Sequence, residues 1–157
     1  MQKPMRYECP LCRLDQRNHS FKKISVRENI HIYYTCPSEA KLYNDKEGIL
    51  KHYNGMLNEL PKDNEWIWIF DSFDFGLKHC LEIDVGIGLA KLITKKFSKN
   101  LKKIIIINPS FYISVTYKTL SLFLSNSVKN IIEFNYEYKS SKEVLNNLFS
   151  LKNDKKR

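Results

Sequence analysis

Four isoleucines in succession lie within the segment Ile104-Ile105-Ile106-Ile107-Asn108-Pro109-Ser110-Phe111. A strand whose neighbouring side chains are all apolar is buried on both faces, which is typical of parallel sheets covered by helices. Asn108-Pro109 ends this strand, and residues 111–124 form an expected helix with apolar side chains around most of its circumference. Such a helix needs apolar contact on two sides. The segment therefore predicts either a lid over an apolar pocket or a helix wholly buried in the core.

Strand and helix patterns alternate on both sides of this segment. Strand patterns occur at residues 21–26, 30–34, 66–70, 103–107 and 129–134. Helical spacing occurs at residues 45–60, 81–97, 111–124 and 144–151. The first two strands are close enough to form a hairpin, and the later alternation favours right-handed crossovers between parallel strands. We therefore expect an α/β fold, in which a mostly parallel, twisted sheet has helices packed on it and an apolar gate helix over a pocket.

The length of 157 residues suits one domain that builds its own core without disulfide staples. We expect a polar arm over residues 1–20, the folded domain over 21–151 and a disordered basic tail over 152–157. No apolar run reaches about 18 residues, and the first residues are charged and broken by proline, so we expect neither a membrane span nor a secretory signal. These features predict a cytoplasmic protein with reduced cysteines.

The net charge of +9 favours acidic partners, either anionic membrane surfaces or nucleic acid. The basic run from the end of the expected helix at 81–97 to the start of the isoleucine strand is a candidate contact for lipid headgroups. Its members, with one lysine further along the chain, are Lys95, Lys96, Lys99, Lys102, Lys103 and Lys129. The alternative is a set of solvated lysines at a helix C-terminus, where cations are favourable. Nucleic-acid binding through the arm and tail is the least favoured of these interpretations.

The arm carries Cys9-Pro10-Leu11-Cys12, whose spacing allows both thiolates to bind one tetrahedral metal ion. A closed zinc site needs two more ligands. The nearest candidates in the sequence are His19 and Cys36, which gives the irregular set Cys9, Cys12, His19 and Cys36. Unligated thiols on the arm are the alternative, and a lone CxxC motif favours them.

Motifs for catalysis are missing from the sequence. Neither Ser72 nor Ser110 lies in a G-x-S-x-G elbow, and both common glycine-rich phosphate-binding motifs are absent. Asp71 is better explained as a turn or capping residue, and His79 as a packed or hydrogen-bonded residue, than as an acid–base pair. We therefore expect no enzymatic activity and no nucleotide cofactor.

Three segments resemble the CRAL-TRIO domain, the fold of phosphatidylinositol and phosphatidylcholine transfer proteins and of retinal- and tocopherol-binding proteins. The first runs from Trp66 to Asp71 with His79 eight residues later, and is similar to the family's strand-Asp segment. The other two are similar to the family's entry to the gate helix and to its Pro-Phe-Leu motif, and are Ile104–Pro109 with Phe111 and Tyr117, and Leu122-Phe123-Leu124. No three-helix domain is expected ahead of this fold.

The resemblance implies binding of one hydrophobic ligand, expected to be a phospholipid, for transfer or presentation at a membrane. Apolar burial of the acyl chains would supply most of the affinity. The implied ligand contacts are Trp66, Trp68, Ile104, Ile106, Phe111, Val115, Tyr117, Leu120 and Phe123. Lys99 stands where phosphoinositide-transferring members carry an acidic residue, so phosphoinositide exchange is not expected. The alternative is a scaffold of the same fold whose cavity is filled by side chains and which binds a protein partner.

Overall fold

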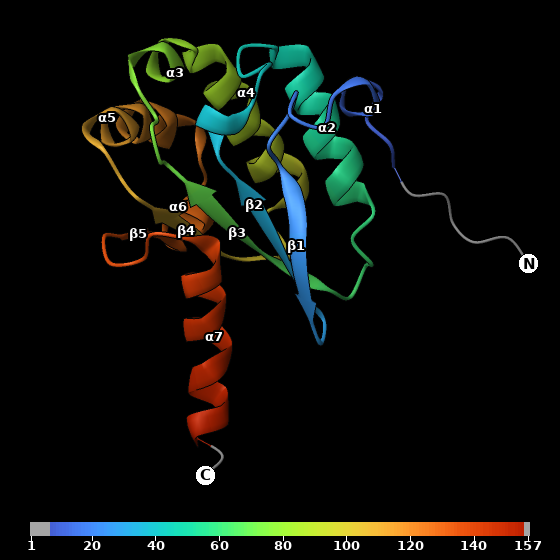
Figure 1. Cartoon of the computed structure of the whole chain (residues 1–157), viewed down its shortest axis with the longest axis vertical. Helices are drawn as coiled ribbons and strands as arrows, with labels where there is room; N and C mark the ends of the chain where they lie inside the picture. The colour runs from blue at the N-terminus through green and yellow to red at the C-terminus, as the bar shows by residue number, and fades with distance from the viewer. Residues whose placement is uncertain (1–6, 156–157) are drawn as a thin grey trace, which may run out of the picture.

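The structure, a computed structural model, describes residues 7–155, with side chains up to Phe149. Five strands form one sheet in the order β1-β2-β3-β4-β5, and only β1 and β2 pair antiparallel. The strands are β1 (Lys22–Arg27), β2 (Ile30–Thr35), β3 (Glu65–Asp71), β4 (Leu101–Ile107) and β5 (Ile132–Asn135). The mostly parallel sheet and its opening hairpin are therefore confirmed (Figure 1).

Most of the helices lie on one face of this sheet. Neighbouring strands are consecutive in sequence, so right-handed crossovers place each connecting helix on the same side. The connecting helices are α2 (Lys46–Asn58), α3 (Leu77–Leu81), α4 (Ile83–Leu92), α5 (Phe111–Leu120) and α6 (Asn126–Lys129). On the other face lie the first turns of α7 (Ser141–Lys155), which pack through Val144 and Leu148, whereas the rest of the helix extends beyond the sheet (Figure 1).

The isoleucine strand serves both faces, as its sequence predicts. Ile104 and Ile106 belong to the core between the sheet and the connecting helices, whereas Ile105 and Ile107 belong to the core under α7. All four are buried. Because side chains alternate along a strand, this run of identical residues fills two separate cores.

Several element boundaries differ from the sequence prediction. The expected helix at 111–124 ends at Leu120 and continues as a 3-10 turn, η3 (Ser121–Phe123). The expected helix at 81–97 consists of α4 and a π-helical turn, η2 (Ile93–Phe97), and a separate short helix, α3, precedes it. The expected strand at 129–134 is shorter, because Lys129 ends α6 and β5 begins at Ile132. Helix α7 extends to Lys155, so the first part of the expected basic tail is helical, and residues 156–157 lie outside the described residues.

The expected polar arm packs against the domain from residue 7 onward. It contains the short helix α1 (Pro10–Leu14), which lies beside α2 (Figure 1). Two glycines on α2 permit this approach, since a Cβ at Gly48 would lie 3.1 Å from Leu11 Cδ1 and one at Gly55 would collide with the ring of Tyr7. Another 3-10 turn, η1 (Pro37–Glu39), follows β2.

Candidate functional site: an apolar cavity beneath α5

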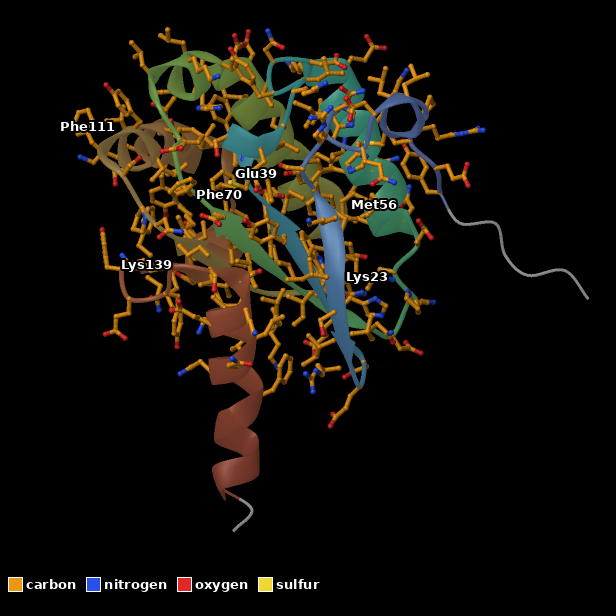
Figure 2. All side chains as sticks on the ribbon, in the orientation of Figure 1. Lys23, Glu39, Met56, Phe70, Phe111 and Lys139 are labelled. Atoms are coloured by element: carbon orange, nitrogen blue, oxygen red, sulfur yellow. The ribbon has the colours of Figure 1, made fainter. Side chains whose placement is uncertain are left out.

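A cavity of about 180 Å³ lies between the sheet and the connecting helices. Its floor is formed by the side chains of three parallel strands that face the helices, namely Trp68, Phe70, Ile104, Ile106 and Ile132. Figure 2 shows Phe70 on β3. The alternation that buries these strands on both faces thus also provides the cavity with an apolar floor.

Helix α5 covers one side of the cavity. Its start is fixed by Ser110, whose Oγ accepts a hydrogen bond from the Ile113 backbone N–H at 3.4 Å. The side chains that line the cavity recur at three- and four-residue spacing, and are Ile113, Thr116, Tyr117 and Leu120. These four side chains form the face of α5 that meets the cavity.

The opposite face of α5 is exposed. Phe111 has 73% of its surface accessible, and Val115 is also exposed. Figure 2 shows Phe111 at the outer end of α5, away from the sheet. The helix is therefore apolar on two sides, as its sequence predicts, but only one side meets the cavity.

Helix α4 forms the adjoining wall, with cavity-lining residues Val85, Gly86, Leu89, Ala90 and Ile93. The middle of this wall projects little into the cavity because Gly86 and Ala90 carry little or no side chain. A Cβ at Gly86 would lie 3.0 Å from Leu120 Cδ1. Gly86 therefore sets how closely α5 approaches α4.

Three buried polar groups of the cavity lining have no hydrogen-bond partner among the described residues: Nε2 of His79, Nε2 of His19 and Oγ1 of Thr116. His79 Nδ1 accepts a hydrogen bond from the Gly76 N–H at 3.1 Å, which places the ring proton of the neutral imidazole on Nε2. Burial lowers the pKa of His79, with a further contribution from the nearby charge of Lys78, and so favours that neutral form. His79 therefore offers a donor, and the Thr116 hydroxyl offers a donor or an acceptor.

Part of the predicted ligand-contact set lines the cavity: Trp68, Ile104, Ile106, Tyr117 and Leu120. The remainder lies elsewhere. Trp66 is fully buried in the core, where its Nε1 donates to the Phe97 carbonyl at 3.0 Å. Phe111 and Val115 point outward because each helical residue turns by about 100°. Phe123 lies on the 3-10 turn η3, and the Nζ atom of Lys91 lies over its ring, 5.2 Å from the ring centroid.

Several residues that line the cavity were not predicted from the sequence as ligand contacts. They come mostly from α2, α4 and the loop after β3, and include Tyr53, Phe75, Val85 and Leu89. The spacing of Val85, Leu89 and Ile93 was a usable signal, because those positions form one stripe of a helix. The polar groups of His79 and Thr116 gave no such signal, since only the fold brings α3 beside α5.

The candidate headgroup lysines lie away from α5. Lys95 and Lys96 lie on η2 and Lys102 and Lys103 begin β4, whereas α5 follows the opposite end of that strand. The seven residues of β4 span about 20 Å. Lys102 pairs with Glu65 at 3.9 Å, and Lys103 with Glu133 at 2.8 Å. Lys99 is exposed in the turn before β4, and Lys129 ends α6.

Three of the four predicted metal ligands lie together and the fourth does not. Cys9, Cys12 and His19 come together, but Cys36 lies at the end of β2, where its Sγ is 3.3 Å from Ser38 Oγ. Their fourth neighbour is His52 of α2, a residue whose position in the sequence shows no metal-ligand spacing.

Asp71 and His79 do not form an acid–base pair. The Asp71 carboxylate accepts hydrogen bonds from Tyr34 Oη at 2.7 Å and from Asn108 Nδ2 at 2.9 Å. These bonds tie the ends of β2, β3 and β4 together. Burial and the bond to Asp71 raise the pKa of Tyr34 well above its usual range, so the phenol stays a donor.

Comparison with known proteins agrees with this architecture. The family model for the CRAL/TRIO domain matches residues 7–153. The chain belongs to the CRAL/TRIO domain family. CRAL/TRIO proteins are generally lipid-binding carriers and not enzymes. No helix among the described residues of this CRAL/TRIO chain combines the length and apolarity needed to cross a membrane.

The crystal structure of Sfh5 resembles this CRAL/TRIO chain with a TM-score of 0.61 and 9% sequence identity. The match covers 82% of this chain and 57% of the Sfh5 chain. At that identity the likeness shows a shared fold alone. No curated protein matches the sequence.

Proposed function

We propose that this CRAL/TRIO domain binds one hydrophobic ligand beneath α5 and carries or presents it at a membrane. The observation that supports this function is the cavity of about 180 Å³, whose floor and walls are almost wholly apolar. Its volume is below the roughly 300–1,000 Å³ typical of small-molecule sites. A phospholipid therefore requires α5 to move outward, and a single acyl chain or a compact hydrophobe requires less movement.

The polar groups of the cavity suggest how a ligand is oriented. A donor at His79 Nε2 and the hydroxyl of Thr116 suit a ligand oxygen, such as a carbonyl or carboxylate. Satisfying such buried groups contributes to selectivity, because a ligand without the oxygen leaves them unpaired. We therefore favour an apolar chain with one oxygen-bearing end over a pure hydrocarbon.

The outer surface near the gate suits a membrane interface. The exposed apolar side chains of α3, α5 and the adjoining loops are Phe73, Leu77, Leu81, Phe111, Val115 and Leu122. Lys78 on α3 and Lys118 on α5 lie among them in sequence and supply positive charge for anionic headgroups. A surface helix with apolar residues and flanking lysines can bury its apolar face at the headgroup boundary. The lysines near β4 are then a second, more distant electrostatic contact.

The direct test is native mass spectrometry of the purified chain, compared with its denatured mass. A lipid-sized adduct that disappears on denaturation would support the proposal and give the ligand class. Transfer of a fluorescent phospholipid between liposomes, with and without the protein, would then separate transport from mere binding. A bare native mass together with no acceleration of transfer would contradict the proposal.

The modest cavity volume favours one alternative, a protein-interaction scaffold of the same fold. In that case the exposed residues of α3 and α5 would contact a protein partner, and the cavity would stay closed. The two functions differ in one measurement: the carrier binds liposomes and takes up lipid, whereas the scaffold does neither at the same protein concentration.

A further inference from the structure

A buried cluster of two cysteines and two histidines lies beside the cavity and shares only His19 with its lining. Cys9 precedes α1 and Cys12 lies within it, His19 lies in the loop before β1, and His52 lies on α2. The four side-chain ligand atoms are all within 4.8 Å of one another. Cys9, His19 and His52 are buried, and Cys12 is partly buried.

The distances within the cluster match those around a tetrahedral ion. His19 Nδ1 is 3.4 Å from Cys9 Sγ and 3.5 Å from Cys12 Sγ. His52 Nδ1 is 3.9 Å from Cys12 Sγ. Zinc bonds of about 2.3 Å to sulfur and 2.0–2.1 Å to nitrogen would separate sulfur from nitrogen by about 3.6 Å at the tetrahedral angle. Small side-chain adjustments would bring all four atoms onto one ion.

The orientation of His52 is fixed from outside the cluster. Its Nε2 lies 2.7 Å from the Phe21 carbonyl, which can only accept, so Nε2 carries the proton and Nδ1 presents its lone pair to the cysteines. A backbone carbonyl that holds the second ring nitrogen is the usual outer partner of a metal-binding histidine. This bond distinguishes His52 from a histidine that is merely packed.

The charges also suit a zinc ion. Metal binding requires neutral imidazoles and thiolates, and the cluster offers two of each side chain. Two thiolates and one divalent zinc ion form a neutral unit, which is less costly to bury than an isolated charge.

We infer that Cys9, Cys12, His19 and His52 form a structural zinc site that fastens the N-terminal segment to α2. The four protein ligands leave no open position for a water or a substrate, which is typical of structural and not catalytic zinc. The site joins α1 and the nearby loop before β1 to α2, which lies much further along the sequence. It also explains why the segment from residue 7 onward packs against the domain although it exposes charged side chains.

The test uses the full chain, purified under reducing conditions and stripped of metal with a chelator. Titration with Co²⁺ should give the visible ligand-field bands of a tetrahedral site and the near-ultraviolet bands of thiolate-to-cobalt charge transfer, saturating at one equivalent. One equivalent of Zn²⁺ should then abolish both sets of bands. A wild-type chain that shows no such bands, although a thiol assay finds Cys9 and Cys12 reduced, would overturn the inference.

Matched variants locate the site. Cys12→Ser and His52→Gln should lose the one-equivalent binding, whereas Cys36→Ser and His31→Gln remove the same chemical groups elsewhere and should keep it. Retention in His52→Gln, or loss in Cys36→Ser, would overturn the assignment. If either ligand variant fails to fold, the wild-type thermal midpoint with and without chelator still decides: a structural zinc site requires that midpoint to fall when the metal is removed.

Discussion

Leu120 of α5 packs closely over Gly86 on α4: a Cβ at Gly86 would lie 3.0 Å from Leu120 Cδ1, so any larger side chain there would have to displace the leucine. Both residues line the cavity. The approach of α5 to α4 therefore depends on a glycine in the adjoining wall. This contact provides a way to displace α5 without changing α5 itself.

Gly86→Val should push α5 outward and speed the exchange of a bound hydrophobic ligand. Overpacking of this kind costs about 1–3 kcal/mol of unfolding free energy. Gly88→Val is the matched control, because a Cβ there would meet Leu50 of α2 at 3.0 Å and not α5. Stopped-flow release of a fluorescent fatty acid should be faster for Gly86→Val alone. Equal release rates for the two variants would contradict the gate assignment.

Tyr117→Lys should abolish lipid uptake while leaving the domain folded. Tyr117 lines the cavity and packs edge-on against Phe134 at a centroid distance of 5.3 Å, so a lysine there would place a charge in an apolar space or draw α5 open. Native mass spectrometry measures the uptake, and circular dichroism the fold. Undiminished uptake by a folded Tyr117→Lys chain would mean that this face of α5 does not bound the ligand site.

Phe111→Lys should leave ligand binding in solution unchanged and weaken binding to liposomes several-fold. The ring is largely exposed and does not line the cavity, so its removal changes only the surface offered to a bilayer. Co-sedimentation with anionic vesicles measures the effect. Val26→Lys, which replaces an exposed apolar residue on β1, is the control that should retain vesicle binding. Equal losses in the two variants would remove the argument for an α5-side interface.

The stability of the domain should fall as pH drops below about 6.5, in part through His79. Burial holds the pKa of His79 below its ordinary value, so the unfolded chain binds this proton more readily than the folded chain. Its contribution is therefore fully present above pH 6.5 and declines as pH falls through that value. Urea unfolding of wild type and His79→Gln between pH 7.5 and 5.5 measures it. The variant should lose less stability over that range, and parallel curves for the two proteins would show that His79 does not titrate in this window.

The layered architecture could be predicted from the sequence because it depends on period and order. The isoleucine strand and the alternation of strands and helices each have a local pattern. So does the start of α2, where the Asp45 side chain accepts a hydrogen bond from the Gly48 N–H. Consecutive parallel strands with right-handed crossovers then leave few topologies. The end of α5 could not be located in the same way, since apolar residues continue past Leu120 into the 3-10 turn. Hydrophobicity alone does not mark a change of helix type.

The site was harder to predict because its members come from distant segments. Trp66 and Trp68 point to the same face of their strand, yet only Trp68 lines the cavity. Trp66 is buried further along the strand, where its Nε1 donates a hydrogen bond to the Phe97 carbonyl. His52 lies beside Cys9, Cys12 and His19 only because α1 packs on α2. Sequence distance favoured Cys36 instead, since β2 is nearer along the chain, although its end lies elsewhere in space.

The alternation of Ile104 to Ile107 has an evolutionary consequence. Residues that shape the cavity and residues that hold α7 occupy successive positions of the same strand, but they contact different neighbours. A mutation at Ile104 or Ile106 can therefore change the shape of the cavity while the packing of α7 is preserved, and a mutation at Ile105 or Ile107 can do the reverse. The shape of the cavity and the packing of α7 are thus open to separate selection, residue by residue, within a single strand.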